Sequence, residues 1–278
     1  MSNREKMGIR VIDVLDWIIN CAFHMIMLAI LGISAFSLYD TYKIYNDAAP
    51  DNMYSRYRPL ADGSLSLSFG ELMEQNPDVI AWLTIDDTNI DYPVVQGENN
   101  SYYLNRDALG DYSLSGSIFV DSENASDFSN PYTLLYGHHM DYDVMFGGLD
   151  HFEDEDYFYS HRTGRLWISD DSYYEVTVVS CLATDAYDSR AFCVTPDEDE
   201  NLLTVMHEYL KEKSLIYADD VDTDAHLLGL STCTSAGTNA RTLVFCTIGH
   251  LTDELEAQAE HESSQASVKK FKNIDGCN

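Results

Sequence analysis

The longest apolar stretch of the chain lies near its N-terminus. Residues 17–38 contain no charged side chain. At a rise of about 1.5 Å per residue, a helix of this length covers the hydrocarbon core of a bilayer. The pattern therefore predicts a transmembrane anchor over 17–38, preceded by a short segment, 1–16, and followed by a polar, tyrosine-rich stalk over 39–67.

Charged residues on either side of this run predict its orientation. Basic side chains precede it and a net acidic set follows it: Arg4, Lys6 and Arg10 on one side, and Asp40, Lys43 and Asp47 on the other. By the positive-inside rule, residues 1–16 are cytoplasmic and the rest of the chain lies outside the cell. A cleaved signal peptide is the alternative, because ISA at 33–35 resembles a cleavage site. The run exceeds the usual h-region of about 7 to 15 residues, which favours an uncleaved single-pass anchor.

From residue 68 onward, apolar residues come in short runs that are rich in β-branched and aromatic types, which is typical of strands. Eight strands are predicted: 79–85, 92–96, 117–121, 133–140, 165–169, 173–184, 226–233 and 241–251. Eight strands in one domain favour a mostly β protein, built as a closed or nearly closed barrel over residues 68–251. Residues 252–278 carry few large apolar groups and are predicted to form a disordered tail.

Two helices are predicted beside these strands from capping boxes, in which a hydroxyl residue is followed three positions later by Glu. Ser68 and Glu71 form one box, which opens the domain. Thr195 and Glu198 form the other, at the start of an insertion between the sixth and seventh strands. An apolar stripe at helical spacing over 195–213 predicts that this second helix packs against the barrel.

The composition excludes one class of partner. The 278 residues include 16 Lys and Arg against 47 Asp and Glu, which gives a formal charge of -31. Nucleic-acid binding rests mainly on Lys and Arg side chains that displace counterions from phosphates, so no nucleic acid is expected as a partner. With 45% hydrophobic residues, the chain can still bury a sizeable core.

Cysteine spacing argues against a metal or disulfide scaffold. The six cysteines are Cys21, Cys181, Cys193, Cys233, Cys246 and Cys277. No two of them form a C-x-x-C pair, so a zinc ribbon is not indicated. Cys181 and Cys193 can pair outside the cell, although free thiols are favoured for both.

One cysteine stands in a setting suited to a nucleophile, which must ionise and therefore needs a nearby positive charge or base. Cys193 is followed closely by four acidic residues, and Cys246 lies in the middle of an apolar strand. Cys233 instead ends a strand, and Arg241 follows eight positions later at the start of the next strand. If these two strands pair, Arg241 returns beside Cys233.

Two of the nine histidines are candidates for the base. In YGHHM, an apolar strand leads to Gly137 and then to His138 and His139, and glycine permits close approach of other chain segments. Adjacent strand residues face opposite sides, so the two histidines are not expected to share one role. The same geometry weakens a zinc site made of His138, His139 and Asp141, and no metal is predicted. Cys233 with one of these histidines is a candidate catalytic pair.

These motifs, in their order along the chain, resemble those of the sortases, membrane-anchored cysteine transpeptidases of Gram-positive bacteria. The match comprises YGHHM at 136–140, LSTC at 230–233 and an arginine at the head of the next strand. Further segments resemble class B sortases: NPDVIAWLTI, IDYPVVQG, NSYYLNRD, GSIFVD, MFGGL and the helix-containing insertion. The resemblance extends from residue 69 to residue 250.

The resemblance implies an eight-stranded sortase barrel with His138, Cys233 and Arg241 as catalytic residues. In the family, the cysteine thiolate attacks a Thr carbonyl within a C-terminal sorting signal, the histidine protonates the leaving amine, and the arginine supports substrate and oxyanion. An amine of peptidoglycan or of a pilus subunit then resolves the thioacyl enzyme. For class B, the implied partners are surface proteins with an NPxT-like signal and a cell-wall amine, and no cofactor is implied.

The resemblance also suggests substrate-binding positions. Ser231, Asn100, Leu104 and Tyr187 match residues that line the class B groove, and for Leu104 and Tyr187 ordinary packing is an equal alternative. His139 is expected to be structural or to lie at the groove edge. Three alternatives to a cell-wall transpeptidase stay open: an extracellular cysteine protease, a pilin-polymerising sortase and a non-catalytic surface binding module.

Overall fold

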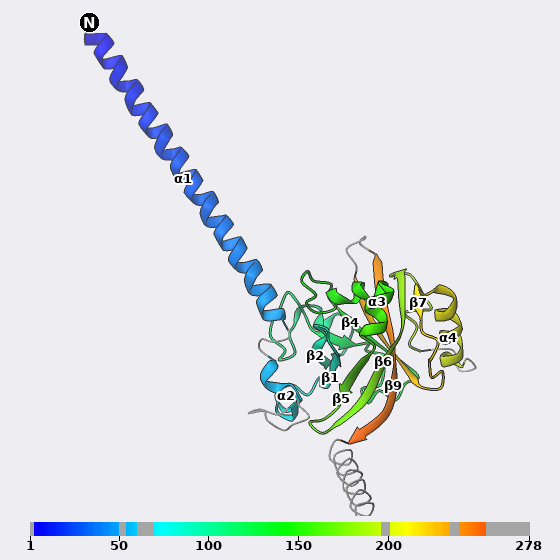
Figure 1. The fold of residues 1–278 in the computed structure, drawn as a ribbon. Coiled ribbons are helices and arrows are strands. Elements are labelled where there is room, and N and C mark those ends of the chain that lie inside the picture. Colours follow the sequence, from blue (N-terminus) through cyan, green and yellow to red (C-terminus); the bar gives the residue numbers. More distant parts are fainter. Residues whose placement is uncertain (1–2, 50–53, 60–68, 196–200, 234–238, 254–278) are drawn as a thin grey trace, which may run out of the picture. The chain divides into compact units, whose positions relative to one another are not determined.

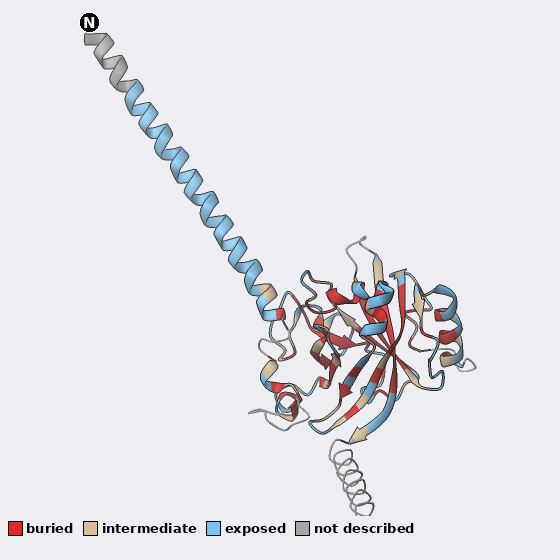
Figure 2. Cartoon of the chain, viewed as in Figure 1, coloured by how far each residue is buried: buried red, intermediate tan, exposed pale blue. Residues whose placement is uncertain are grey.

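The computed structural model describes residues 3–49, 54–59, 69–195, 201–233 and 239–253, as an N-terminal helix and a β domain (Figure 1). The helix, α1, runs without a break over Asn3–Ala48. Its part from Ile12 onward is long and apolar enough to cross a membrane. The large apolar side chains of this part are exposed (Figure 2), as expected for a helix whose solvent is lipid. α1 is therefore a candidate membrane anchor, and it includes the start of the predicted stalk.

Nine strands are described in the β domain, and eight of them close a barrel (Figure 1). The order around the ring is β5-β1-β2-β3-β4-β8-β9-β6, and β6 pairs back with β5. The strands are β1 Val79–Ile85, β2 Asp91–Val95, β3 Ile118–Val120, β4 Tyr132–Gly137, β5 Thr163–Trp167, β6 Ser172–Asp185, β8 His226–Cys233 and β9 Ala240–Asp253. β7, Ile216–Tyr217, pairs with β6 and stands outside the ring. The predicted mostly β, eight-stranded barrel is confirmed.

Several strand ends differ from the predicted ones by one to three residues. β4 ends at Gly137, three residues early, and beyond it the backbone pairs with another segment, where the N–H of Phe146 donates to the His138 carbonyl (3.1 Å). β9 continues to Asp253, which pairs with Ser172 of β6. The first two residues of the predicted tail therefore belong to the sheet, and residues 254–278 lie outside the described residues.

Helices are few and short in the β domain. They are α2 Phe69–Gln75, α3 Glu155–Ser160 and α4 Leu202–Lys213, with the 3-10 helices η1 Ser55–Tyr57, η2 Tyr102–Asn105 and η3 Gly147–Glu153. α4 lies in the insertion between β6 and β8, as predicted. Its buried residues Leu202, Met206 and Leu210 join the barrel residues Tyr132 and Phe245 in one apolar core, so the apolar stripe does pack against the barrel.

The cap of α4 is not the predicted one. The helix begins at Leu202, and the side-chain oxygen of Asn201 accepts a hydrogen bond from the Thr204 N–H (3.3 Å). The Thr195 hydroxyl instead donates to the Glu123 carboxylate (3.2 Å). The predicted cap at Thr195 is therefore wrong, because the helix starts where the buried stripe starts and Asn201 directly precedes it.

The start of α2 is capped from a distant part of the chain. The backbone N–H groups of Phe69 and Gly70 both donate to the carboxylate of Asp170, which comes from the turn between β5 and β6. A carboxylate at a helix N-terminus also interacts favourably with the helix dipole. Ser68 and Glu198, the other members of the predicted capping boxes, lie outside the described residues.

Strand pairing brings three chain segments to one edge of the barrel. β4 and β8 run parallel, so both end at that edge, and Gly137 is opposite Thr232. β8 and β9 run antiparallel, and Cys233 is opposite Arg241. The register therefore places the segment after Gly137, the end of β8 and the start of β9 side by side.

Candidate active site

A cavity of about 400 Å³ opens at this edge of the barrel. Its walls come from the segment between β2 and β3, from β3, β4, β8 and β9, and from the insertion after β6. The lining residues are Asn100, Leu104, Phe119, Tyr136, Gly137, His138, Ala186, Phe192, Ser231, Thr232 and Arg241. Aromatic and apolar walls with a few converging polar groups are typical of a ligand-binding site.

His138 reaches the cavity directly after the end of β4. A Cβ atom on Gly137 would lie 2.5 Å from Ile118 Cδ1 and 2.7 Å from Phe146 Cδ2, so only glycine fits before the histidine. The ring Nε2 of His138 lies 2.8 Å from the carbonyl oxygen of Leu104. Because a carbonyl oxygen can only accept, Nε2 carries the hydrogen, and Nδ1 is the nitrogen left for proton exchange.

Arg241 and Cys233 face each other across the β8–β9 pair. Opposed residues of an antiparallel pair project their side chains to the same face of the sheet. The Arg241 side chain lines the cavity, and its Nη1 donates to the Ala240 carbonyl (2.8 Å). The structure describes the backbone of Cys233 but not its side chain.

Asp121 fixes two polar groups of the cavity wall. Its Oδ2 accepts hydrogen bonds from Asn100 Nδ2 and from the Tyr136 hydroxyl, both at 2.8 Å. The side-chain oxygen of Asn100 in turn accepts from the Ser122 N–H (2.7 Å). Burial raises the pKa of Tyr136 and Asp121 raises it further, against the opposing charge of Arg241. Tyr136 is therefore a neutral hydrogen-bond donor that holds Asp121 in place.

The sequence model of the sortase domain matches residues 83–248, more than half of the chain and most of the barrel. The chain belongs to the sortase family. Sortase B of Listeria monocytogenes is 32% identical over 177 residues, which cover 62% of this chain and 69% of the relative.

Two solved class B structures are similar to this sortase. Clostridium perfringens sortase B matches with a TM-score of 0.60 and 32% identity, over 66% of this chain and 100% of that chain. A Streptococcus pyogenes class B sortase involved in pilus biogenesis matches with a TM-score of 0.58 and 36% identity, over 65% of this chain and 97% of that chain. The class B resemblance is confirmed, and the chain is a sortase-type transpeptidase.

Three of the four predicted substrate-binding residues of this sortase line the cavity: Asn100, Leu104 and Ser231. Tyr187 is 79% exposed and is not part of the described wall, whereas its neighbour Ala186 is. The Ser231 hydroxyl is buried and has no hydrogen-bond partner among the described residues. A buried hydroxyl without a partner is costly, so Ser231 is well suited to bond with a ligand that enters the cavity.

The aromatic wall of the sortase cavity was not predicted from the sequence. Tyr136 lies between two phenylalanine rings, with centroid distances of 5.3 Å to Phe119 and 6.5 Å to Phe192. The Tyr136 and Phe192 rings are nearly parallel, at 5°. Phe192 belongs to the insertion after β6, and no local pattern distinguishes it from a core residue, since only tertiary packing brings it to Tyr136.

The other described cysteines of the β domain are poorly suited to nucleophilic attack. Burial raises the pKa of the Cys181 thiol to about 12 and also raises that of Cys246, which favours the unreactive thiol form. Cys193 is partly exposed, and its Sγ donates to a backbone carbonyl at 3.4 Å. Cys181 and Cys193 are both free thiols in the structure, not a disulfide.

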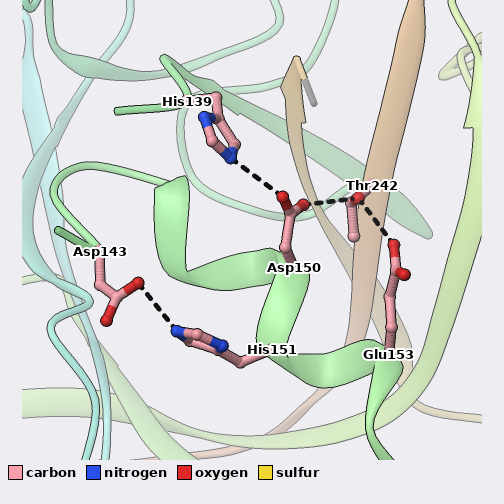
Figure 3. A network of polar contacts seen from close by, with 6 residues as sticks. All are labelled: His139, Asp143, Asp150, His151, Glu153 and Thr242. Carbon is pink, nitrogen blue, oxygen red and sulfur yellow. Dashed lines mark hydrogen bonds and ion pairs between the residues drawn. The ribbon is translucent and has the colours of Figure 1, made fainter. Parts of the chain in front are cut away.

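The two adjacent histidines of the sortase have different partners. His139 Nε2 lies 3.0 Å from Asp150 Oδ2 (Figure 3), whereas His138 Nε2 bonds to the Leu104 carbonyl. Within the described ranges, no group of three or more His, Cys, Asp or Glu side chains is arranged to hold a metal ion. His138 and His139 therefore have separate surroundings, although both lie beyond the end of β4.

Proposed function

We propose that this sortase cleaves surface proteins after the Thr of an NPxT-like C-terminal sorting signal and transfers them to a cell-wall amine. The observation that carries the proposal is that His138 and Arg241 line the same cavity, at the strand end that holds Cys233. An imidazole and a guanidinium beside a thiol favour the thiolate form of the sulfur.

The proposed reaction has two steps. First, the Cys233 thiolate attacks the Thr carbonyl carbon while the Arg241 guanidinium stabilises the oxyanion. The C–N bond breaks, and His138 donates a proton to the leaving amine, which leaves a thioester on Cys233. An acceptor amine then attacks the thioester, His138 takes a proton from that amine, and the sulfur leaves as thiolate. Because the Leu104 carbonyl holds Nε2–H, Nδ1 carries the exchanged proton.

The signal peptide occupies the cavity in this proposal. The Ser231 hydroxyl and the Asn100 amide supply polar contacts, and Leu104, which is 42% exposed, supplies an apolar one. Asn100 is suited to this role because its amide is held by Asp121, so it loses little rotamer freedom on binding. Tyr187, next to the lining residue Ala186, lies at the rim of the proposed groove.

The proposed location is the cell membrane. Residues 1–16 are cytoplasmic, 17–38 cross the membrane as an uncleaved anchor, and 39–67 lead to a catalytic domain over 68–251 outside the cell. Because β9 continues to Asp253, the tail follows over 254–278. The apolar helix α1 and the basic residues that precede its apolar part support this arrangement.

The proposal is tested with full-length protein in detergent micelles and a peptide library that varies the NPxT-like pentapeptide. We expect cleavage after Thr, a thioacyl adduct on Cys233 by mass spectrometry, and an amide product when triglycine or a diaminopimelate analogue is added. Hydrolysis alone, unchanged by added amine, would identify a cysteine protease. No thioacyl adduct with any peptide would instead indicate a non-catalytic binding module.

Pilin polymerisation is the second candidate function. One of the similar structures is a class B sortase involved in pilus biogenesis, at 36% identity. The acceptor separates the two functions, because pilin polymerisation links one protein subunit to another. Amide formation with such a subunit, and none with small cell-wall amines, would favour pilus assembly.

Replacing Arg241 with lysine is expected to lower kcat/KM for peptide cleavage by about 10- to 100-fold. An ammonium group cannot reproduce the planar, two-pronged donor that a guanidinium presents to a developing oxyanion. Initial rates with the preferred peptide measure the effect. Arg165→Lys, on β5 outside the cavity, is the matched control and should keep its rate. Kinetics of Arg241→Lys equal to those of the wild type would remove Arg241 from the proposed mechanism.

A further inference from the structure

A polar network joins the segment after β4, the helix η3 and the strand β9 (Figure 3). Asp150 of η3 lies at its centre. Its Oδ2 is 3.0 Å from His139 Nε2, and its Oδ1 accepts from the Thr242 hydroxyl at 2.8 Å. Glu153 Oε1 is 3.3 Å from the same hydroxyl. A hydroxyl has one hydrogen, and the shorter distance assigns it to Asp150.

The two partners of Asp150 are chain neighbours of proposed catalytic residues. His139 directly follows His138, and Thr242 directly follows Arg241. Arg241 and Thr242 are adjacent in β9, so their side chains face opposite sides of the strand, and His138 and His139 bond to different partners. Asp150 therefore connects the two backbone segments that present His138 and Arg241.

η3 itself is held firmly against the segment after β4. A Cβ atom on Gly147 would lie 1.9 Å from the Met140 carbonyl oxygen, so the start of η3 packs directly on this backbone. The N–H of Met145 donates to the Tyr92 hydroxyl of β2 (2.9 Å). Thr242 is fully buried, whereas the Asp150 side chain is about one-third exposed, so removing the carboxylate takes a hydrogen-bond partner from a buried hydroxyl, which is costly.

We propose that Asp150 is a positioning residue, which sets the separation of His138 and Arg241 by binding His139 and Thr242 at the same time. This inference rests on the proposed function, in which those two side chains act together on one substrate. Asp150 does not touch the substrate. It acts through the backbone, where a displacement on the order of 1 Å is enough to cost about 10²-fold in rate.

A second His–Asp pair, formed by His151 of η3 and Asp143 before this helix, provides a matched control. His151 Nε2 lies 2.8 Å from Asp143 Oδ1, which is as close as the contact between His139 and Asp150 (Figure 3). Both side chains of this pair are about half exposed, and none of the described polar contacts links them to β9. Removing the His151 side chain breaks this pair without disconnecting His138 from Arg241.

The test compares full-length Asp150→Ala with full-length His151→Ala, using steady-state kinetics on the preferred sorting peptide and the pH profile of kcat. We expect Asp150→Ala to lower kcat by about 10- to 100-fold with KM within about twofold of the wild type, and to shift the pH profile. His151→Ala should stay within about twofold in both parameters. A normal kcat for Asp150→Ala, or an equal loss in both variants, would overturn the inference.

Variants at Thr242 test the same inference even if Asp150→Ala does not fold. Thr242→Ser keeps the hydroxyl and should retain most of the rate, whereas Thr242→Val keeps the shape, loses the hydrogen bond and should show the loss in kcat. Similar kinetics for both variants would contradict the proposal.

Histidine NMR signals separate a failure of this inference from a failure of the proposed function. The wild type and Asp150→Ala are titrated without substrate, and the His138 ring signals are followed. We expect Asp150→Ala to move the His138 resonances, and His151→Ala to leave them in place. If no peptide is cleaved by the wild type, the proposed function fails, and the NMR comparison still decides whether Asp150 positions His138. If the wild type cleaves the peptide and Asp150→Ala leaves the His138 resonances unmoved, the positioning role is refuted and the proposed function stands.

Discussion

Replacing Cys233 with alanine is expected to abolish cleavage of the sorting peptide, with kcat/KM falling by at least about 10³-fold. The proposed reaction passes through a thioester on this sulfur, and no other described cysteine of the β domain can replace it. Burial raises the pKa of Cys181 and Cys246, so both stay protonated. Release of a fluorogenic NPxT-like peptide measures the rate, and mass spectrometry of the protein shows whether an adduct forms.

Cys193→Ala is the matched control for this substitution. Cys193 is a free, partly exposed thiol in the insertion, and its removal should leave the rate within about twofold, as for most surface changes. Substantial turnover by Cys233→Ala, or a loss in Cys193→Ala as deep as in Cys233→Ala, would refute the assignment of the nucleophile.

Replacing His138 with alanine should have an effect of similar size, about 10² to 10⁴-fold in kcat, because proton transfer to the leaving amine would have no donor. His139→Ala should lose less activity than His138→Ala, because its side chain does not line the cavity and losing its bond to Asp150 should cost no more than the about 10- to 100-fold expected for Asp150→Ala. Single-turnover measurements distinguish loss of chemistry from weaker peptide binding. The reverse order of activities would transfer the proposed role from His138 to His139.

A third variant separates the proton-transfer role of His138 from its structural contact. The ring Nε2 donates to the Leu104 carbonyl, and His138→Gln retains an N–H donor at a similar reach but cannot exchange a proton at neutral pH. His138→Gln should therefore be as inactive as His138→Ala while the protein stays folded. Recovery of activity in His138→Gln would mean that holding the Leu104 segment is the main role of His138.

Local sequence patterns were sufficient for the elements of the barrel. All eight predicted strands form, because each combines β-branched or aromatic residues with turn residues at its ends. The same patterns placed Cys233 at the end of one strand and Arg241 at the start of the next, and the structure pairs them. That pairing needs only a short connection, so a sequence can show it.

Features that depend on distant contacts were not accessible in this way. The N-terminus of α2 is capped by Asp170, about 100 positions away, and α4 starts after Asn201 and not after Thr195. Phe192 enters the cavity wall only through stacking on Tyr136. The bond between His139 and Asp150 likewise requires η3 to pack on the end of β4. Each case is decided by tertiary packing, which local propensity does not encode.

Enzymatic activity in a newly made chain must wait until the barrel closes. Gly137 of β4 and its partner Thr232 of β8 are 95 positions apart, and they pair in parallel. Contacts of such long sequence separation form slowly, since a large loop has to be ordered before any strand bonding compensates for it. During synthesis, the chain therefore contains His138 long before Cys233 is added. The proposed active site can therefore form only after β8 and the start of β9 have been made and have paired.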